Sequence, residues 1–239
     1  MNTGTERDQH SDQHSDQHSD QRPEKPREVD VLSWKSMTAS DLQALLTAQG
    51  IDISQWDNAR KGLPDLLKEI AEGEAELIQH PEHGFVRRLK VLTIEVRHKN
   101  IDGSESMLFE DRQEWHEKID DDTGKPRVDR RPGMNHISEK LVAGEIAEYG
   151  QGVTSKAIAR ALKEELGVHS FEKPSFLGQH DEFDNRQSYP GLKSIYQLYR
   201  YRVYLPDSEM KEQYIEVGEE KTTYFYWRRV SPLDQDTVS

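Results

Sequence analysis

Apolar residues between positions 31 and 80 recur at intervals of three and four. One set follows Asp41 and a second set follows Gly62. The two sets are Leu42, Leu45 and Leu46, and then Leu63, Leu66, Leu67 and Ile70. This spacing places each set on one face of a helix, so we predict a small helical region over residues 31–80. Trp34 and Trp56 are its expected packing anchors.

From residue 84 onward, strand patterns replace the helical spacing. In the segment 86–99, apolar side chains occupy both alternating sets of positions, which predicts a strand covered on both faces for part of its length. Further strands are predicted where aromatic and β-branched residues gather, at 106–115, 194–205 and 222–230. Residues 116–135 are highly charged, and we expect a long functional or mobile loop there.

One well-defined helix is predicted to begin near Ser155. Thr154 or Ser155 can cap its first turn, and Gly167 stands where a left-handed residue ends a helix. One side carries an apolar line and the other carries charges: Ile158, Leu162 and Leu166 against Arg160, Lys163, Glu164 and Glu165. Strands wrapped around a single central helix indicate an α+β fold.

The composition separates a polar tail from the folded part. Hydrophobic residues make up 33% of the chain and charged residues 32%, so part of the chain is too polar to pack. We expect a disordered low-complexity tail over 1–30, the helical region over 31–80, the main domain over 84–233 and a flexible C-terminus over 234–239. The tail repeats the unit DQHS, and its histidines are either a transition-metal tract or the product of a slipped repeat: His10, His14 and His18.

Charge and composition exclude several classes of function. The formal net charge of −13 disfavours general nucleic-acid binding, which normally uses a basic surface. The chain has no cysteine, so disulfides, thiolate metal sites and cysteine nucleophiles are excluded. No apolar run is long enough for a membrane span, and the first residues lack the apolar core of a signal peptide. We therefore expect a soluble, cytoplasmic protein with no membrane contact.

The predicted helix and the loop before it resemble a Nudix box. That family's pattern is a glycine, five residues, a glutamate, seven residues and then R-E-U-x-E-E-x-G-U, where U is a bulky aliphatic residue. Residues 160–168 (Arg-Ala-Leu-Lys-Glu-Glu-Leu-Gly-Val) match the second half in register, with Ala161 in place of the first glutamate. The first half departs further, because strict spacing places Ile146 at the glycine and Gly152 at the first acid.

The resemblance implies a mixed sheet in an α/β/α sandwich over about residues 84–233. It also implies a site where Mg²⁺ or Mn²⁺ directs water onto a nucleoside diphosphate derivative. Arg160 would orient the glutamates, and Glu164 and Glu165 would be the catalytic, metal-binding acids. Glu145 and Glu148 in the preceding loop are further candidate metal ligands. Several clustered carboxylates suit Mg²⁺ because this ion prefers oxygen ligands.

The missing acids decide the activity that we expect. If each lost charge-assisted contact costs about 1.5 to 3 kcal/mol, two missing acids would lower cation occupancy by orders of magnitude. We therefore predict a diverged protein that binds a nucleoside diphosphate-type ligand with weak or no hydrolysis, its metal weakly bound or absent. One alternative is an active hydrolase with replacement acids from 181–184 or 216–220. Another is a scaffold that binds a protein partner through 31–80, although a brace for the main domain is the plainer interpretation of that region.

Arginines before and after the box are candidate phosphate ligands. Arg127, Arg130 and Arg131 lie in the charged segment that would approach the metal-binding face in the Nudix fold. Arginines on the later strands could clamp phosphates while neighbouring tyrosines stack on a base: Arg200, Arg202, Arg228 and Arg229. Packing within the sheet is the plainer interpretation of each of these strand residues.

Overall fold

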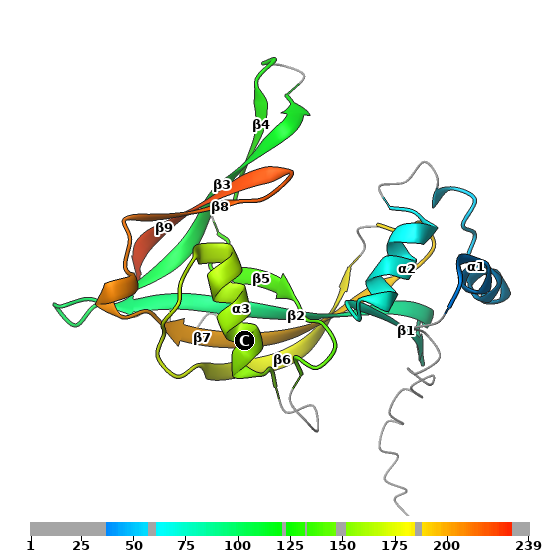
Figure 1. Cartoon of the computed structure of the whole chain (residues 1–239), viewed down its shortest axis with the longest axis horizontal. Helices are drawn as coiled ribbons and strands as arrows, with labels where there is room; N and C mark the ends of the chain where they lie inside the picture. The colour runs from blue at the N-terminus through cyan, green and yellow to red at the C-terminus, as the bar shows by residue number, and fades with distance from the viewer. Residues whose placement is uncertain are drawn as a thin grey trace, which may run out of the picture.

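The computed structural model describes residues 37–56, 61–120, 123–131, 133–146, 152–184 and 188–230. The DQHS tail, Trp34, Glu148 and residues 234–239 lie outside these ranges, and so do the predictions made for them. The described residues contain one nine-stranded mixed sheet and three α-helices, so the α+β class is confirmed. Helix α3 lies against the middle of the sheet, and helices α1 and α2 lie at one end (Figure 1).

Strand β2 (Gly84–Lys99) is the central strand of the sheet. One edge of β2 pairs in parallel with β7 (Ser194–Tyr204) over most of its length. The other edge pairs with three antiparallel strands: β1 (Ala75–His80), β5 (Ile137–Lys140) and β3 (Glu105–Ile119). Residues 91–98 are all buried, as predicted for a strand covered on both faces.

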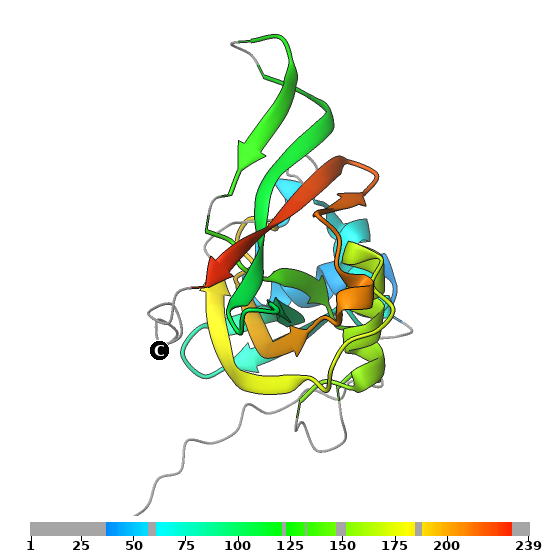
Figure 2. The same cartoon turned by 90° about the vertical axis from the view of Figure 1, so that its left-hand side faces the viewer.

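The sheet divides where β3 stops pairing with β2, and we call this point the fork of the sheet. Only the first residues of β3 pair with β2, and its later residues pair with β4 (Pro126–Arg130). Strands β9 (Lys221–Val230) and β8 (Gln213–Val217) follow β3 on one side, and β6 (Ser175–Asp184) ends the sheet beside β7. Figure 2 shows β3 and β4 extending away from the rest of the sheet.

The segment 116–135, predicted as a loop, is largely a β-hairpin. Strand β3 continues to Ile119, and β4 returns antiparallel beside it. The Trp115 indole N–H donates to Asp129 Oδ2 at 2.8 Å across the two strands. High charge is compatible with this hairpin because most of its side chains are exposed, so no charge has to be buried to form the pairing.

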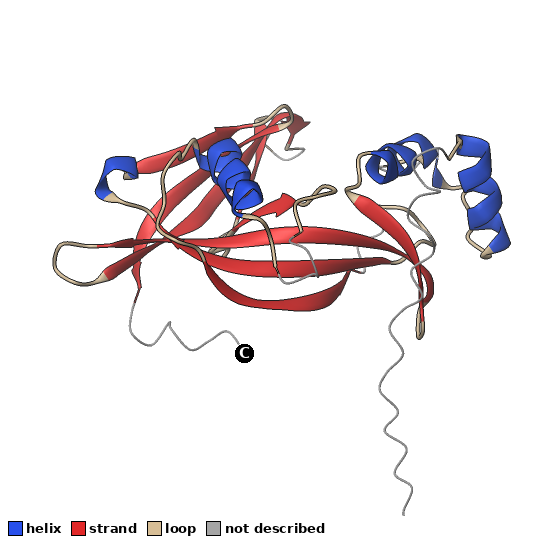
Figure 3. Cartoon of the chain, turned by 60° about the horizontal axis from the view of Figure 1, so that its bottom comes forward, coloured by secondary structure: helices blue, strands red, loops and turns tan. Residues whose placement is uncertain are grey.

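Helix α3 (Ser155–Leu166) covers one face of the sheet (Figure 3). As predicted, Thr154 caps its start by accepting the Ala157 N–H, and Gly167 ends it in the left-handed conformation with φ 63°. The core between helix and sheet combines α3 side chains with residues of β2 and β7: Ala157, Ile158, Ala161, Leu162 and Leu166 with Leu92, Ile94, Val96, Tyr199, Tyr201 and Val203. This packing holds α3 at the fork of the sheet.

Helices α1 (Ala39–Ala48) and α2 (Leu63–Ala71) form the predicted helical region and share a second core with the sheet. Trp56 is 2% exposed, and its indole N–H donates to the Pro190 carbonyl at 2.7 Å. Strand β1, which falls within the region 31–80, belongs to the sheet and not to the helices. These contacts favour the interpretation of the helical region as a brace.

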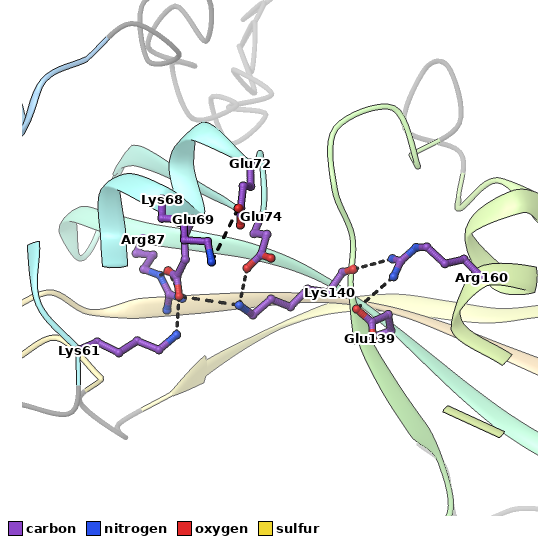
Figure 4. Close-up of polar contacts among 9 residues, drawn as sticks. All are labelled: Lys61, Lys68, Glu69, Glu72, Glu74, Arg87, Glu139, Lys140 and Arg160. Carbon is purple, nitrogen blue, oxygen red and sulfur yellow. Dashed lines mark hydrogen bonds and ion pairs between the residues drawn. The ribbon is translucent and has the colours of Figure 1, made fainter. Parts of the chain in front are cut away.

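A buried ion pair fastens α2 to the sheet. Arg87 on β2 donates from Nε and Nη2 to Glu69 Oε2 at 2.9 and 2.6 Å. Lys61 donates to the other Glu69 oxygen at 2.6 Å, and Lys140 lies 3.8 Å from it. Burial opposes ionisation of Glu69, but these cations hold its pKa below the ordinary value. Figure 4 shows Lys140 of β5 between this network and Arg160 of α3.

Candidate functional site

Ala161 stands at the position of a metal-binding glutamate in the Nudix pattern, and it is fully buried. Its side chain belongs to the core between α3 and the sheet. Leu162, its neighbour in the pattern, is also fully buried, as expected for the bulky aliphatic position. The alanine therefore completes the apolar packing of the helix, and the charged positions of α3 lie elsewhere on its surface.

Arg160, in the middle of α3, contacts acidic side chains of the helix and of the segments before it. Its Nε and Nη2 donate to Glu145 at 2.8 and 3.0 Å, and its Nη1 donates to Glu164 at 2.7 Å. Nη2 also donates to the Lys140 carbonyl at 3.0 Å, and Nη1 lies 3.3 Å from Glu139 (Figure 4). The hydrogen bond with Glu145 is the main reason that the Arg160 pKa is raised.

Two of the predicted metal ligands, Glu145 and Glu164, form hydrogen bonds with Arg160. Both carboxylate oxygens of Glu145 accept from Arg160, and one also accepts the Val142 N–H at 3.0 Å. Burial opposes ionisation of Glu145, but these hydrogen bonds lower its pKa below the ordinary value. The Glu164 side chain is 55% exposed beside Arg160. Neither acid lines the cavity that Glu165 faces.

Glu165 lines a cavity of about 360 Å³ between α3 and strands β3, β5, β8 and β9. Glu216 of β8 and Glu139 of β5 lie close to its carboxyl group. Burial, followed by repulsion from Glu216 and Glu139, raises the pKa of Glu165 to about 9. This environment favours the protonated form of Glu165, and a perturbed acid in a cavity is a mark of a functional site.

The sequence pointed to one of these two neighbours and missed the other. Glu216 falls in the segment 216–220 that we considered as a source of replacement acids. Glu139 is not among the predicted residues, although a signal for it exists: it lies two residues after Ile137 on a short strand and therefore faces the same side. Because Ile137 packs in the core beneath α3, Glu139 is directed toward the helix.

The three predicted phosphate-binding arginines separate in the structure. Arg131 lines the Glu165 cavity, where Lys221 supplies a second positive charge. Arg127 is 2.9 Å from Asp129, and Arg130 is 3.7 Å from Asp111. Both of these arginines are on β4, and neither lines the cavity.

A second cavity, of about 450 Å³, contains several arginines on the face of β2 opposite α3. Four arginines of three strands line it together with two acids: Arg97, Arg200, Arg202, Arg228, Glu95 and Glu182. Glu95 pairs with both Arg97 and Arg202, and the Arg228 guanidinium stacks 3.7 Å from the centre of the Phe109 ring. His136 lines both cavities, so they are neighbours at the fork of the sheet.

The acids do not complete a metal site. Within the described ranges, no group of three or more His, Asp or Glu side chains is placed to hold one metal ion. Glu165, Glu139 and Glu216 supply oxygen ligands of the kind that Mg²⁺ prefers, but as placed here they do not form such a group. In the same described residues, no helix is both long and apolar enough to cross a membrane.

Comparisons with known proteins leave the family of the chain open. No protein-family model matches the chain, and no curated protein matches it. Among solved structures, the chain is similar to C. elegans Ap4A hydrolase with 13% sequence identity and a TM-score of 0.27. That match covers 59% of this chain and 79% of the other. The description of the fold rests on the strand order and the core of this chain, not on that match.

Proposed function

We propose that the chain is a Nudix-fold protein that binds a nucleoside diphosphate-type ligand at the cavity beside Glu165, with weak or no hydrolysis. Arg131 and Lys221 would contact the diphosphate, because both line this cavity and carry the charge that phosphate oxygens require. A protonated Glu165 would donate a hydrogen bond to a ligand oxygen instead of repelling it.

The observation that carries this proposal is the separation of the box residues. Glu165 lines the cavity, whereas Glu164 pairs with Arg160 and Ala161 is buried in the core. Efficient hydrolysis of this type needs several acids around a cation that neutralises phosphate and activates water. A single cavity-facing box acid supports ligand binding better than it supports turnover.

An active hydrolase is the second candidate, and a specific contact favours it. Glu139 and Glu216 lie beside Glu165, so two acids from outside the box approach the surviving one. A divalent cation would relieve the repulsion between these carboxylates. If the side chains rearrange around such an ion, they could replace the missing acids of the box.

Turnover and binding assays distinguish the two candidates. The purified protein would be incubated with ADP-ribose, NADH, dinucleoside polyphosphates and nucleoside triphosphates in Mg²⁺ and then in Mn²⁺, and released products would be measured. We expect a rise in melting temperature with at least one compound and little product, because a ligand that binds the folded state stabilises it. Clear turnover that Glu165→Gln abolishes and Glu164→Gln preserves would replace this proposal with the active enzyme. If no compound produces either stabilisation or turnover, both candidates are rejected.

A further inference from the structure

One wall of the Glu165 cavity carries buried polar atoms that have no hydrogen-bond partner among the described residues. They are Glu110 Oε1 and Gln113 Oε1 on β3, and Thr223 Oγ1 on β9. The three residues are only 5%, 3% and 2% exposed, and all of them line this cavity. We call them the polar wall. Its residues come from β3 and β9, and none of them contacts Arg160.

Unpartnered buried oxygens are costly, which makes their concentration in one wall informative. A buried acceptor without a partner has lost its hydrogen bonds to water and has gained none in the protein, which destabilises the folded state. The Arg131 Nε forms an ion pair with Glu110 Oε1 at 3.6 Å, a distance that is too long for a hydrogen bond. Burial is also the main reason that the Glu110 pKa is raised. A ligand that donates hydrogen bonds to the wall would remove this penalty.

The chemistry of the wall selects the kind of group that fits it. Two of the three atoms, Glu110 Oε1 and Gln113 Oε1, are acceptors of N–H or O–H donors, and the Thr223 hydroxyl can both accept and donate. Arg131 and Lys221 already bring two positive charges to a cavity that also holds Glu110, Glu165 and Glu216, so the donor group that we assign to the ligand is an uncharged one. Amino groups of nucleobases and hydroxyl groups of sugars both supply uncharged donors.

We propose that Glu110, Gln113 and Thr223 form a recognition subsite for an uncharged, donor-bearing group of the ligand, either a nucleobase amine or sugar hydroxyls. This inference rests on the proposed function for the remainder of the ligand, the diphosphate. It adds a specificity determinant on β3 and β9. A site built to accept hydrogen bonds discriminates strongly against a ligand that lacks the donors, because its buried oxygens then stay unpaired.

Two ligand pairs distinguish the two sources of donors. GDP and IDP differ by one base amine, and UDP-glucose and UDP differ by the sugar. Dissociation constants would be measured by calorimetry for the full chain, with and without Mg²⁺, and free guanosine and glucose would be tested by NMR titration. In at least one pair, we expect the donor-bearing member to bind about tenfold or more tightly than its partner.

Thr223→Val tests the subsite with little change of shape, and Thr222→Val is its matched control on the same strand. Thr222 Oγ1 already has a partner, because it lies 2.9 Å from His116 Nε2, and it does not line the cavity. We expect Thr223→Val to reduce the discrimination to about twofold or less while leaving the melting temperature unchanged or higher, since it removes an unpartnered hydroxyl. Thr222→Val should keep the discrimination.

The possible results separate this inference from the proposed function. Diphosphates that bind equally within both pairs, or a discrimination that survives Thr223→Val and also Gln113→Met, would overturn the subsite and leave the proposed function standing. Binding of guanosine or glucose that depends on Thr223, without tighter binding of any diphosphate, would support the subsite and reject the proposed function. No binding by any compound would overturn both.

Discussion

The guanidinium of Arg160 holds the carboxylate of Glu145 through two hydrogen bonds, from Nε to Oε1 at 2.8 Å and from Nη2 to Oε2 at 3.0 Å. This two-point contact joins the middle of α3 to the segment that follows β5, and the Lys140 carbonyl accepts a third bond from the same arginine. Arg160 therefore fixes the approach to the helix as well as its acids. Glu145 has no oxygen outside this network.

Replacing Arg160 with lysine should loosen the segment before α3. Lysine keeps the positive charge but cannot form the two-point contact with Glu145, so we expect a loss of about 1 to 3 kcal/mol in the free energy of unfolding. Urea denaturation measures this loss, and hydrogen exchange should be faster over residues 141–146. Lys163→Gln, an exposed change on the same helix, is the control. Unchanged exchange in Arg160→Lys would show that the contact does not order the segment.

Glu165 should make the protein less stable as the pH rises. Its pKa is raised from an ordinary 4.5 to about 9, so between these values the folded chain holds a proton that the unfolded chain releases. The free energy of unfolding therefore falls with increasing pH in this window, by at most about 1.4 kcal/mol per pH unit for one proton. Glu165→Gln should remove this dependence and stabilise the protein at neutral pH.

The measurement for Glu165 is urea denaturation at a series of pH values between 5 and 9. Glu164→Gln is the matched control, because this neighbouring acid is 55% exposed and pairs with Arg160. It should leave the pH dependence in place. If the two variants have the same slope as the unaltered protein, repulsion among Glu165, Glu139 and Glu216 is not the source of the dependence.

Restoring the acid of the Nudix pattern at position 161 should damage the fold. The pattern by itself suggests that Ala161→Glu increases metal affinity, but Ala161 is 0% exposed within the core. A carboxylate there would be buried among apolar side chains, and we expect a loss of about 3 kcal/mol or more in the free energy of unfolding.

Thermal denaturation and Mg²⁺ calorimetry test Ala161→Glu together. Ala161→Ser, which adds one small polar atom at the same place, serves as the control for any change in packing. A variant that keeps its melting temperature and binds Mg²⁺ more tightly would contradict the buried position of this side chain.

The pair Glu69 and Arg87 should be strongly coupled. Arg87 is 2% exposed, so removing Glu69 leaves a buried charge with less compensation, and we expect Glu69→Gln to cost about 3 to 5 kcal/mol. The double variant Glu69→Leu with Arg87→Met should cost less than the sum of the two single changes, as a double-mutant cycle would measure. Additive costs would show that the pair does not act as a unit.

The stabilisation that Glu69 and Arg87 provide should be lost at low pH. The Glu69 pKa is held below its ordinary value of 4.5. The unfolded chain therefore binds a proton first as the pH falls below that value, and the stabilisation is lost progressively there. Urea denaturation between pH 3 and 6 should show a weaker acid dependence in the double variant than in the unaltered protein.

Local pattern was sufficient to locate several elements. Helix α3 begins after Thr154 and ends at Gly167 because capping and the left-handed conformation depend on neighbouring residues alone. The long apolar segment became β2 for a similar reason, since alternation along a strand determines which side chains share a face. The charged hairpin was missed because its pairing depends on β3, not on the composition of residues 116–135.

The sequence by itself determined the helix, the main strands and the resemblance of residues 160–168 to half of a Nudix box. Only the tertiary structure decided that Ala161 is core, that Glu164 turns to Arg160, and that Glu165 meets Glu139 and Glu216. Periodicity assigns a side chain to a face of its own element. Which faces meet depends on strand pairing and on packing at the fork of the sheet, and those contacts join residues far apart in the chain.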